Sequence, residues 1–274
     1  MTPSISVSHL SKTYGSTLAV NDLSFNVYPG QVLGILGANG SGKTTTLKAL
    51  LGLIEHQGEV KILGFDTRAQ RTQMLKHVAF ISDTNTLPTW MTALQAIEVM
   101  NDLHPNFNAS QAIASLQKTT IAPTTKIKDM SKGMVVQLHL ALVLAVNASV
   151  LVLDEPTLGL DILYRRHFYD ILINEYMTEE RSIVITTHQL EEFENLLTDI
   201  LLIKNGHSLL NTSVENVHNT YAWVEGVHPQ ALDVRTSVLR QTTSLIKTSD
   251  ANGTPIAARP TMSDIFAALA KENV

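Results

Sequence analysis

Short apolar runs alternate with longer amphipathic stretches along the first 200 residues of the chain. Residues 4–8 and 18–27 have the pattern of strands, with Tyr14-Gly15 in the turn between them. Five short apolar runs predict buried strands, at 32–36, 59–63, 77–81, 150–153 and 182–186. Helices are predicted over about 43–53, through most of 92–148, and near 161–177 and 262–271.

Strands that alternate with helices predict an α/β fold, with a mainly parallel sheet that carries helices on both faces. The opening strands add an antiparallel β region, and the long helical stretch forms an inserted subdomain. We therefore divide the chain into a core at 1–83 and 136–210, a helical subdomain at 84–135, and a small C-terminal appendage at 211–274. The appendage carries no chemical motif, so packing and regulation are both open roles for it.

The composition narrows the possible functions. Hydrophobic residues make up 44% of the 274 residues and the net charge is −5, which supports a large core and weighs against a protein built to hold phosphate backbones. The chain contains no cysteine, as suits a reducing compartment. Residues 138–153 are largely apolar but are interrupted by His139 and Asn147, so a buried helix followed by a strand explains them better than a membrane span.

A glycine-rich segment, GANGSGKT at residues 37–44, matches the pattern G-x-x-x-x-G-K-[ST]. It lies between an apolar strand and a helix, where glycines let the backbone curl around phosphate groups and the helix N-terminus adds positive charge. Lys43 is expected to bridge the terminal phosphates, and Thr44 to ligate Mg²⁺. The alternative is a glycine-rich turn without a ligand. The predicted nucleotide-binding residues of this loop are Gly37, Ala38, Asn39, Gly40, Ser41, Gly42, Lys43, Thr44 and Thr45.

Two acids end the apolar strand in VLVLDEP, residues 150–156. Ligands of an open parallel sheet bind beyond the carboxyl ends of its strands, so these acids and the phosphate loop are expected to meet around one nucleotide. Asp154 would hold Mg²⁺, and Glu155 would orient and polarise the attacking water. The alternative is that both acids cap a strand before Pro156, with no catalytic role.

With these motifs in place, residues 4 to about 210 resemble the ATP-binding subunits of ABC transporters. The resemblance rests on the opening stretch around GANGSGKT, on DEPTLGLD at 154–161 and on TTHQLEE at 186–192, in the order that the family has them. It implies that Tyr14 stacks on adenine, although a tyrosine that packs on its own strand is the alternative. It also implies that His188 contacts the γ-phosphate as a catalytic residue, and that Asp161 belongs to a loop that crosses to a second subunit.

Two segments depart from the family's pattern. MSKGM at 130–134 stands where the family has LSGGQ; it keeps Ser131 and Gly133, which the resemblance assigns to the nucleotide held by the opposite subunit, and it places Lys132 between them. Asp83 stands where the family usually has a glutamine that reaches the metal, so it is a third candidate ligand for Mg²⁺ or a loop acid without metal contact.

The resemblance implies an ATPase that uses ATP and Mg²⁺ and dimerises around them, as a homodimer or with a second ATP-binding subunit. It would drive a separate transmembrane permease subunit, most similar to export systems, from the cytoplasmic face of the membrane. Trp90 and Met91 are candidates for the contact with the permease, or ordinary core residues. The alternatives are an ABC-type ATPase of DNA repair, chromosome maintenance or translation, and a regulator that binds nucleotide without hydrolysis; no nucleic acid partner is expected.

Overall fold

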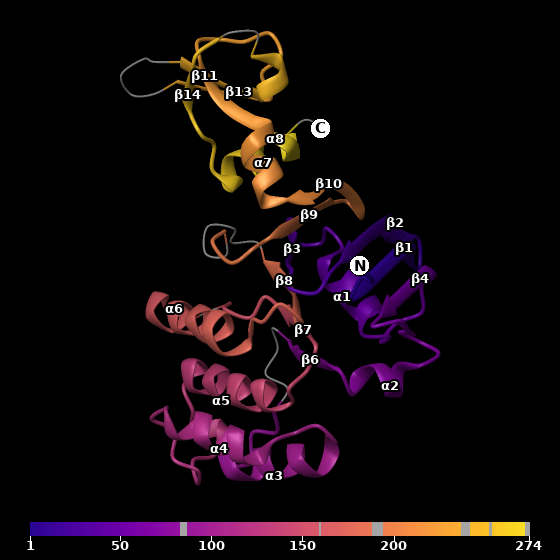
Figure 1. The fold of residues 1–274 in the computed structure, drawn as a ribbon, viewed down its shortest axis with the longest axis vertical. Coiled ribbons are helices and arrows are strands. Elements are labelled where there is room, and N and C mark those ends of the chain that lie inside the picture. The colour runs from indigo at the N-terminus through magenta and orange to yellow at the C-terminus, as the bar shows by residue number, and fades with distance from the viewer. Residues whose placement is uncertain (83–86, 159, 188–193, 237–241, 252–253, 272–274) are drawn as a thin grey trace.

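The computed structural model describes residues 1–82, 87–158, 160–187, 194–236, 242–251 and 254–271 (Figure 1). Its central layer is a six-stranded sheet with the order β10-β9-β3-β8-β7-β6. The strands are β3 (Val32–Leu36), β6 (Val78–Ile81), β7 (Val150–Asp154), β8 (Ser182–Thr187), β9 (Asp199–Lys204) and β10 (His207–Ser213). All neighbours pair in parallel except β10, which runs antiparallel to β9.

The strands β3, β7 and β8 are buried along their whole length, since both faces of the sheet are covered. Alternate residues of β7 point to opposite faces, so Leu151 and Leu153 belong to one hydrophobic cluster and Val150 and Val152 to another. The predicted mainly parallel α/β fold is thereby confirmed.

An antiparallel sheet and helix α1 (Lys43–Leu50) cover the Val150 face. That sheet has the order β2-β1-β4-β5, and its strands are β1 (Ile5–Tyr14), β2 (Thr17–Val27), β4 (Gln57–Ile62) and β5 (Phe65–Asp66). The strand predicted at residues 4–8 is too short, because β1 continues to Tyr14 beyond bulges in its pairing with β2, and His9 at a φ of 54° breaks the alternating pattern. The short helix α2 (Arg71–Leu75) was not predicted.

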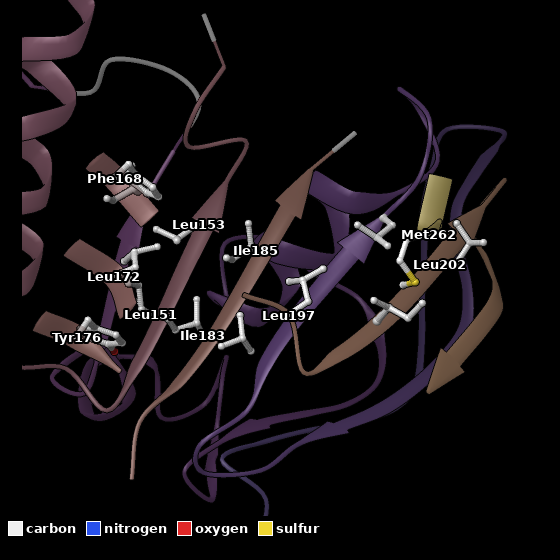
Figure 2. Packing of buried hydrophobic residues seen from close by; sticks show 14 of the residues in the cluster. Leu151, Leu153, Phe168, Leu172, Tyr176, Ile183, Ile185, Leu197, Leu202 and Met262 are labelled. Carbon is white, nitrogen blue, oxygen red and sulfur yellow. The ribbon is translucent and has the colours of Figure 1, made fainter. Parts of the chain in front are cut away.

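Helices cover the opposite face of the central sheet. Helix α6 (Ile162–Ile171) continues into the π-helical turn η2 (Leu172–Tyr176), where the sequence predicted one helix to about 177. Figure 2 shows Phe168, Leu172 and Tyr176 of this segment packing on the side chains of β7 and β8. The segment therefore covers the strands that end at the predicted acids and at Thr187.

The helical subdomain consists of α3 (Ala93–Leu103), α4 (Ala109–Gln117) and the first part of α5 (Lys132–Ala145), with the 3-10 turn η1 (Ile127–Asp129) before α5. It lies at one end of the molecule (Figure 1). The division drawn between residues 135 and 136 falls inside α5. This helix packs Leu138 and Leu142 on the subdomain and Leu140 and Leu144 on the central core, so it joins the two parts.

The C-terminal appendage lies at the opposite end and contains a third sheet with the order β12-β13-β11-β14 (Figure 1). Its elements are α7 (Val214–Thr220), β11 (Tyr221–Glu225), β12 (Asp233–Thr236), β13 (Thr242–Lys247), the 3-10 turn η4 (Thr248–Asp250), β14 (Ile256–Ala258) and α8 (Met262–Lys271). Met262 and Ile265 of α8 reach a small space that Leu36 and Leu202 of the central sheet also line. The hydrophobic core is thus continuous from the central sheet into the appendage.

We expect Ile265→Ala to destabilise the whole chain, because Ile265 is 2% exposed within this continuous core. Truncation of a buried isoleucine costs about 2–5 kcal/mol of unfolding free energy. The measurement is urea unfolding followed by circular dichroism. Ile256→Ala is the matched control, since Ile256 lies in the same appendage but is 61% exposed, and it should change the unfolding free energy by less than about 0.5 kcal/mol. Equal losses in the two variants would contradict the packing of α8.

Candidate functional site

The loop between β3 and α1 curls back on itself because three of its residues are glycines with positive φ. Gly37, Gly40 and Gly42 have φ values of 158°, 80° and 114°. At Gly42 a Cβ atom would lie 2.6 Å from the carbonyl oxygen of Ala19. A side chain there is excluded both by this close approach and by the left-handed backbone, so glycine is required for the loop to lie against β2.

Lys43, the first residue of α1, is held over this loop. Its side chain is 6% exposed, and Nζ donates hydrogen bonds to the carbonyl oxygens of Gly37 at 2.8 Å and Ala38 at 3.3 Å. The same Nζ lies 3.6 Å from Oε1 of Glu155, which follows β7. The structure therefore brings the predicted lysine and the predicted catalytic acid together, although 112 residues separate them in the sequence.

Asp154 ends β7 and is almost completely buried. Its Oδ1 accepts a hydrogen bond from Thr186 Oγ1 at 2.5 Å and lies 3.5 Å from Thr44 Oγ1, the first-turn hydroxyl of α1. A hydroxyl and a carboxylate are oxygen donors of the kind that Mg²⁺ prefers, so this pair fits the predicted metal. Among the described residues, no group of three or more His, Asp or Glu side chains has the geometry of a metal site by itself. A magnesium ion here would need further oxygen ligands, which phosphate groups can supply.

Glu155 has a left-handed backbone, with a φ of 47°, which is uncommon for a residue other than glycine. Thr186 holds this conformation, because the Glu155 amide donates to the Thr186 carbonyl at 3.2 Å and to its hydroxyl at 3.1 Å. Backbone strain of this kind persists only where surrounding contacts fix it, and it is common at catalytic sites. Thr186 was missed as a site residue in the sequence; the only signal is its place at the end of a buried strand beside β7.

A cavity of about 630 Å³ opens over these groups. It is lined by Tyr14, Ala19, Asn39, Gly40, Gly42, Lys43, Thr44, Thr45, Glu155 and Leu158. The predicted loop residues and Glu155 thus face one space, with Tyr14 at its border. Lys12 Nζ lies 4.9 Å from the centroid of the Tyr14 ring, and Tyr14 is 45% exposed. Lys12 was not predicted to take part.

Ser131 and Asp161 do not line this cavity, and each caps a helix instead. Ser131 Oγ accepts a hydrogen bond from the amide of Met134 at the start of α5, and Asp161 Oδ1 accepts from the amides of Leu163 and Tyr164 at the start of α6. The starts of α5 and α6 are in contact through Gly133 and Tyr164. A Cβ on Gly133 would lie 3.0 Å from the Tyr164 ring, so there is little room for a side chain at position 133. The predicted Asp83 and His188 lie outside the described residues.

A second cavity of about 660 Å³ separates the start of α5 from the ends of β6 and β7. Lys132, His139 and Glu155 line it together, so the lysine that departs from the family's signature borders the same space as the predicted catalytic acid. His139 is partly buried on α5, and its burial lowers its pKa to about 4. In the sequence this histidine was noted only as an interruption of the apolar run at 138–153, not as a site residue.

The sheet order, the phosphate loop after β3 and the acids after β7 together define a P-loop nucleoside triphosphatase. A sequence profile described as "ABC transporter" matches residues 20–158, which is half of the chain. An uncharacterized ABC transporter ATP-binding protein of Methanocaldococcus jannaschii is 30% identical over 226 residues, 82% of this chain and 83% of that protein. The chain belongs to the ABC transporter ATP-binding family.

Other relatives agree. The Nod factor export ATP-binding protein I of Rhizobium etli is 31% identical, over 75% of this chain and 66% of that protein. A solved ATP-binding subunit of an ABC transporter matches with a TM-score of 0.72 and 23% identity over 79% of this chain and 92% of that one, which supports the fold. The protein is the ATP-binding and ATP-hydrolysing subunit of an ABC transporter, in preference to an ATPase of DNA repair or translation. None of its helices, within the described residues, has the length and apolar character needed to span a bilayer.

The lowered pKa of His139 makes stability depend on pH. In the unfolded chain this histidine has a pKa near 6.5, and in the folded chain about 4, so the unfolded state binds more protons between these values. The free energy of unfolding therefore falls by up to about 3 kcal/mol as pH falls from 6.5 to 4. We expect His139→Gln to remove this part of the slope, measured as the difference in urea unfolding free energy between wild type and variant from pH 7 to pH 4. A difference that does not change with pH would contradict the assignment.

Proposed function

We propose that the loop at residues 37–45 and the two acids after β7 form the hydrolytic half-site of this subunit. The observation that carries the proposal is the convergence of Lys43 on Glu155 at 3.6 Å and of Thr44 on Asp154 at 3.5 Å. The glycine backbone and the N-terminus of α1 bind the α- and β-phosphates, and Lys43 neutralises charge on the β- and γ-phosphates. Tyr14, at the border of the same cavity, stacks on the adenine ring.

Thr44 and Asp154 would hold Mg²⁺, and Thr186 keeps the Asp154 carboxylate in place through its 2.5 Å hydrogen bond. When bound, the ion withdraws charge from the phosphate oxygens and so eases attack at phosphorus. The Asp154 side chain is 4% exposed, and a buried carboxylate needs a cation or hydrogen-bond donors around it. These properties support its role as a metal ligand more than a role in capping the strand.

Glu155 accepts a proton from the attacking water. The water oxygen forms a bond to the γ-phosphorus, the bond from that phosphorus to the bridging oxygen breaks, and ADP leaves with the electron pair. The carboxylate is suited to this task because its backbone is fixed by Thr186 and it faces the cavity beside Lys43. His188 would contact the γ-phosphate, and Asp83 would approach the metal, as the resemblance to the family implies.

Two copies, or this chain and a second ATP-binding subunit, enclose each nucleotide. Ser131 and Gly133 then offer the amides at the start of α5 to the γ-phosphate of the opposite subunit, and Asp161 lies in the loop between the two sites. Three large apolar side chains around the start of α6 are strongly exposed: Leu158, which lines the cavity, at 53%, Ile162 at 65% and Leu163 at 73%. Exposed apolar side chains grouped in this way support a protein contact at the start of α6. A related ATP-binding cassette, similar in fold with a TM-score of 0.66, is a dimer bound to ADP and Pi.

The subunit works on the inner face of the membrane with a separate transmembrane permease, in the export direction. The Nod factor export proteins among its relatives support this direction. Trp90 in the helical subdomain is 65% exposed and supports a contact with the permease, whereas Met91 packs partly into the subdomain core. Co-purification from membranes tests the assignment: recovery with an integral membrane protein, lost in Trp90→Ala but kept in the core variant Met91→Leu, is the expected result.

The mechanism predicts that Glu155→Gln binds ATP but hydrolyses it about 10²–10⁴-fold more slowly, because the amide cannot accept the proton. The trapped ATP should hold two subunits together, which size exclusion with light scattering will detect. Glu180→Gln is the matched control, because Glu180 is exposed, and it should turn over like wild type. Near wild-type phosphate release by the Glu155 variant would remove Glu155 from the mechanism.

Lys43→Ala should weaken ATP binding about 100-fold, since it removes a buried cation from the triphosphate. Equilibrium dialysis with labelled ATP measures the effect. Lys48→Ala provides the comparison, because Lys48 lies in the same helix α1 but is exposed and does not line the cavity. Unchanged affinity in the Lys43 variant is the outcome that the phosphate-loop assignment does not allow.

A further inference from the structure

The turn between β9 and β10 touches the back of the phosphate loop. Asn205 and Gly206 form it, with φ values of 50° and 81°. The amide of Gly206 donates a hydrogen bond to the carbonyl oxygen of Ser41 at 2.9 Å, and the carbonyl of Gly206 accepts one from the amide of Asn21 at 2.9 Å. This single residue of the turn thus bonds both to the phosphate loop and to β2.

The contact leaves almost no space. A Cβ on Gly206 would lie 3.0 Å from the carbonyl oxygen of Ala19 and 3.2 Å from Cα of Val20. A Cβ on Gly42 of the phosphate loop would lie 2.6 Å from the same Ala19 oxygen. A glycine of the turn and a glycine of the loop thus both pack closely against the Ala19 carbonyl of β2. The turn is also joined to the loop by the hydrogen bond from Gly206 to Ser41.

We propose that Gly206 is a positioning residue for nucleotide binding, because it fixes the orientation of the Ser41–Gly42 peptide. This peptide is trans, so its carbonyl and its N–H point in opposite directions. The bond from Gly206 holds the Ser41 carbonyl towards the back of the loop. The Gly42 N–H consequently points away from the turn, towards the cavity that Gly42 lines with Lys43 and Thr44.

An amide that already has the bound orientation lowers the free-energy cost of nucleotide binding, because the peptide does not have to rotate when the phosphate binds. It acts on substrate and transition state alike, so its loss raises KM and leaves kcat nearly unchanged. The side chains that carry the chemistry have other partners: Lys43 is hydrogen-bonded to the Gly37 carbonyl and paired with Glu155, and Asp154 accepts a hydrogen bond from Thr186. We expect these contacts to persist when Gly206 is changed. The inference rests on the proposed function of the phosphate loop.

The test is Gly206→Ala, with Gly226→Ala as the matched control. Both glycines have a φ of 81°, but a Cβ on Gly226 meets nothing within 4 Å, and Gly226 lies in the C-terminal appendage. The two variants therefore carry the same strained backbone, and only the first disturbs the loop. We expect the Kd for ADP and the KM for ATP to rise about tenfold in Gly206→Ala, or 1.4 kcal/mol, with kcat within about threefold and Gly226→Ala like wild type. Equal affinities in the two variants, or equal losses, would overturn the proposal.

Hydrogen exchange in the wild-type chain tests the same bond without a substitution that could prevent folding. The Gly226 amide is also hydrogen-bonded, to the Thr242 carbonyl at 2.8 Å, and serves as the reference. Saturation with ADP should slow exchange at Gly206 at least about fivefold more than at Gly226, since the bound phosphate stabilises the arrangement that Gly206 holds. An equal effect at both amides would count against the proposal. A wild-type chain that binds no ADP would end the phosphate-loop assignment itself, which is a separate result.

Discussion

The parallel pairing of β3 with β8 and of β8 with β7 sets the geometry on which the site depends. In this register Leu36 lies opposite Thr187, and Asp154 lies opposite Thr186. Neighbouring strands are about 4.8 Å apart, so the start of the phosphate loop and the acids after β7 are about 10 Å apart before any side chain extends. Lys43 and Glu155 bridge this interval. A slip of one residue in β8 would turn Thr186 to the other face and leave Asp154 and the Glu155 amide without their partner.

The strength of that register comes from burial on both faces. Leu151 and Leu153 pack against the helical layer, while Val150 and Val152 pack towards α1, so no residue of β7 is free to shift without exposing apolar surface. The same argument explains why Glu155 can keep a left-handed backbone. Thr186 is part of a fully buried strand and cannot move away from the Glu155 amide that it binds. The rigid sheet thus fixes the orientation of the Glu155 carboxylate.

The sequence predicts the parts of the site that are contiguous along the chain. GANGSGKT and VLVLDEP each contain a strand end and its chemistry, so local pattern alone places Lys43, Thr44 and Asp154. Thr186 and Gly206 were missed because each acts through a partner distant in the sequence, Asp154 and Ser41 respectively. The strand β9 was also missed, since its apolar run Ile200–Ile203 follows loop residues and precedes the weak pattern of the tail. The full length of β1 was not predicted either, because the bulge at His9 interrupts the alternating pattern of the strand.

The C-terminal appendage is better understood as an extension of the ATPase core than as an attached domain. Met262 and Ile265 of its helix α8 belong to the same hydrophobic cluster as Leu36, the residue immediately before the phosphate loop, and Leu202 of β9, and line a small space with them. From β9 the chain turns at Gly206, which binds Ser41 of the loop, and β10 then leads directly into α7 of the appendage. The appendage therefore reaches the nucleotide loop by two routes, one through apolar packing and one through a backbone hydrogen bond.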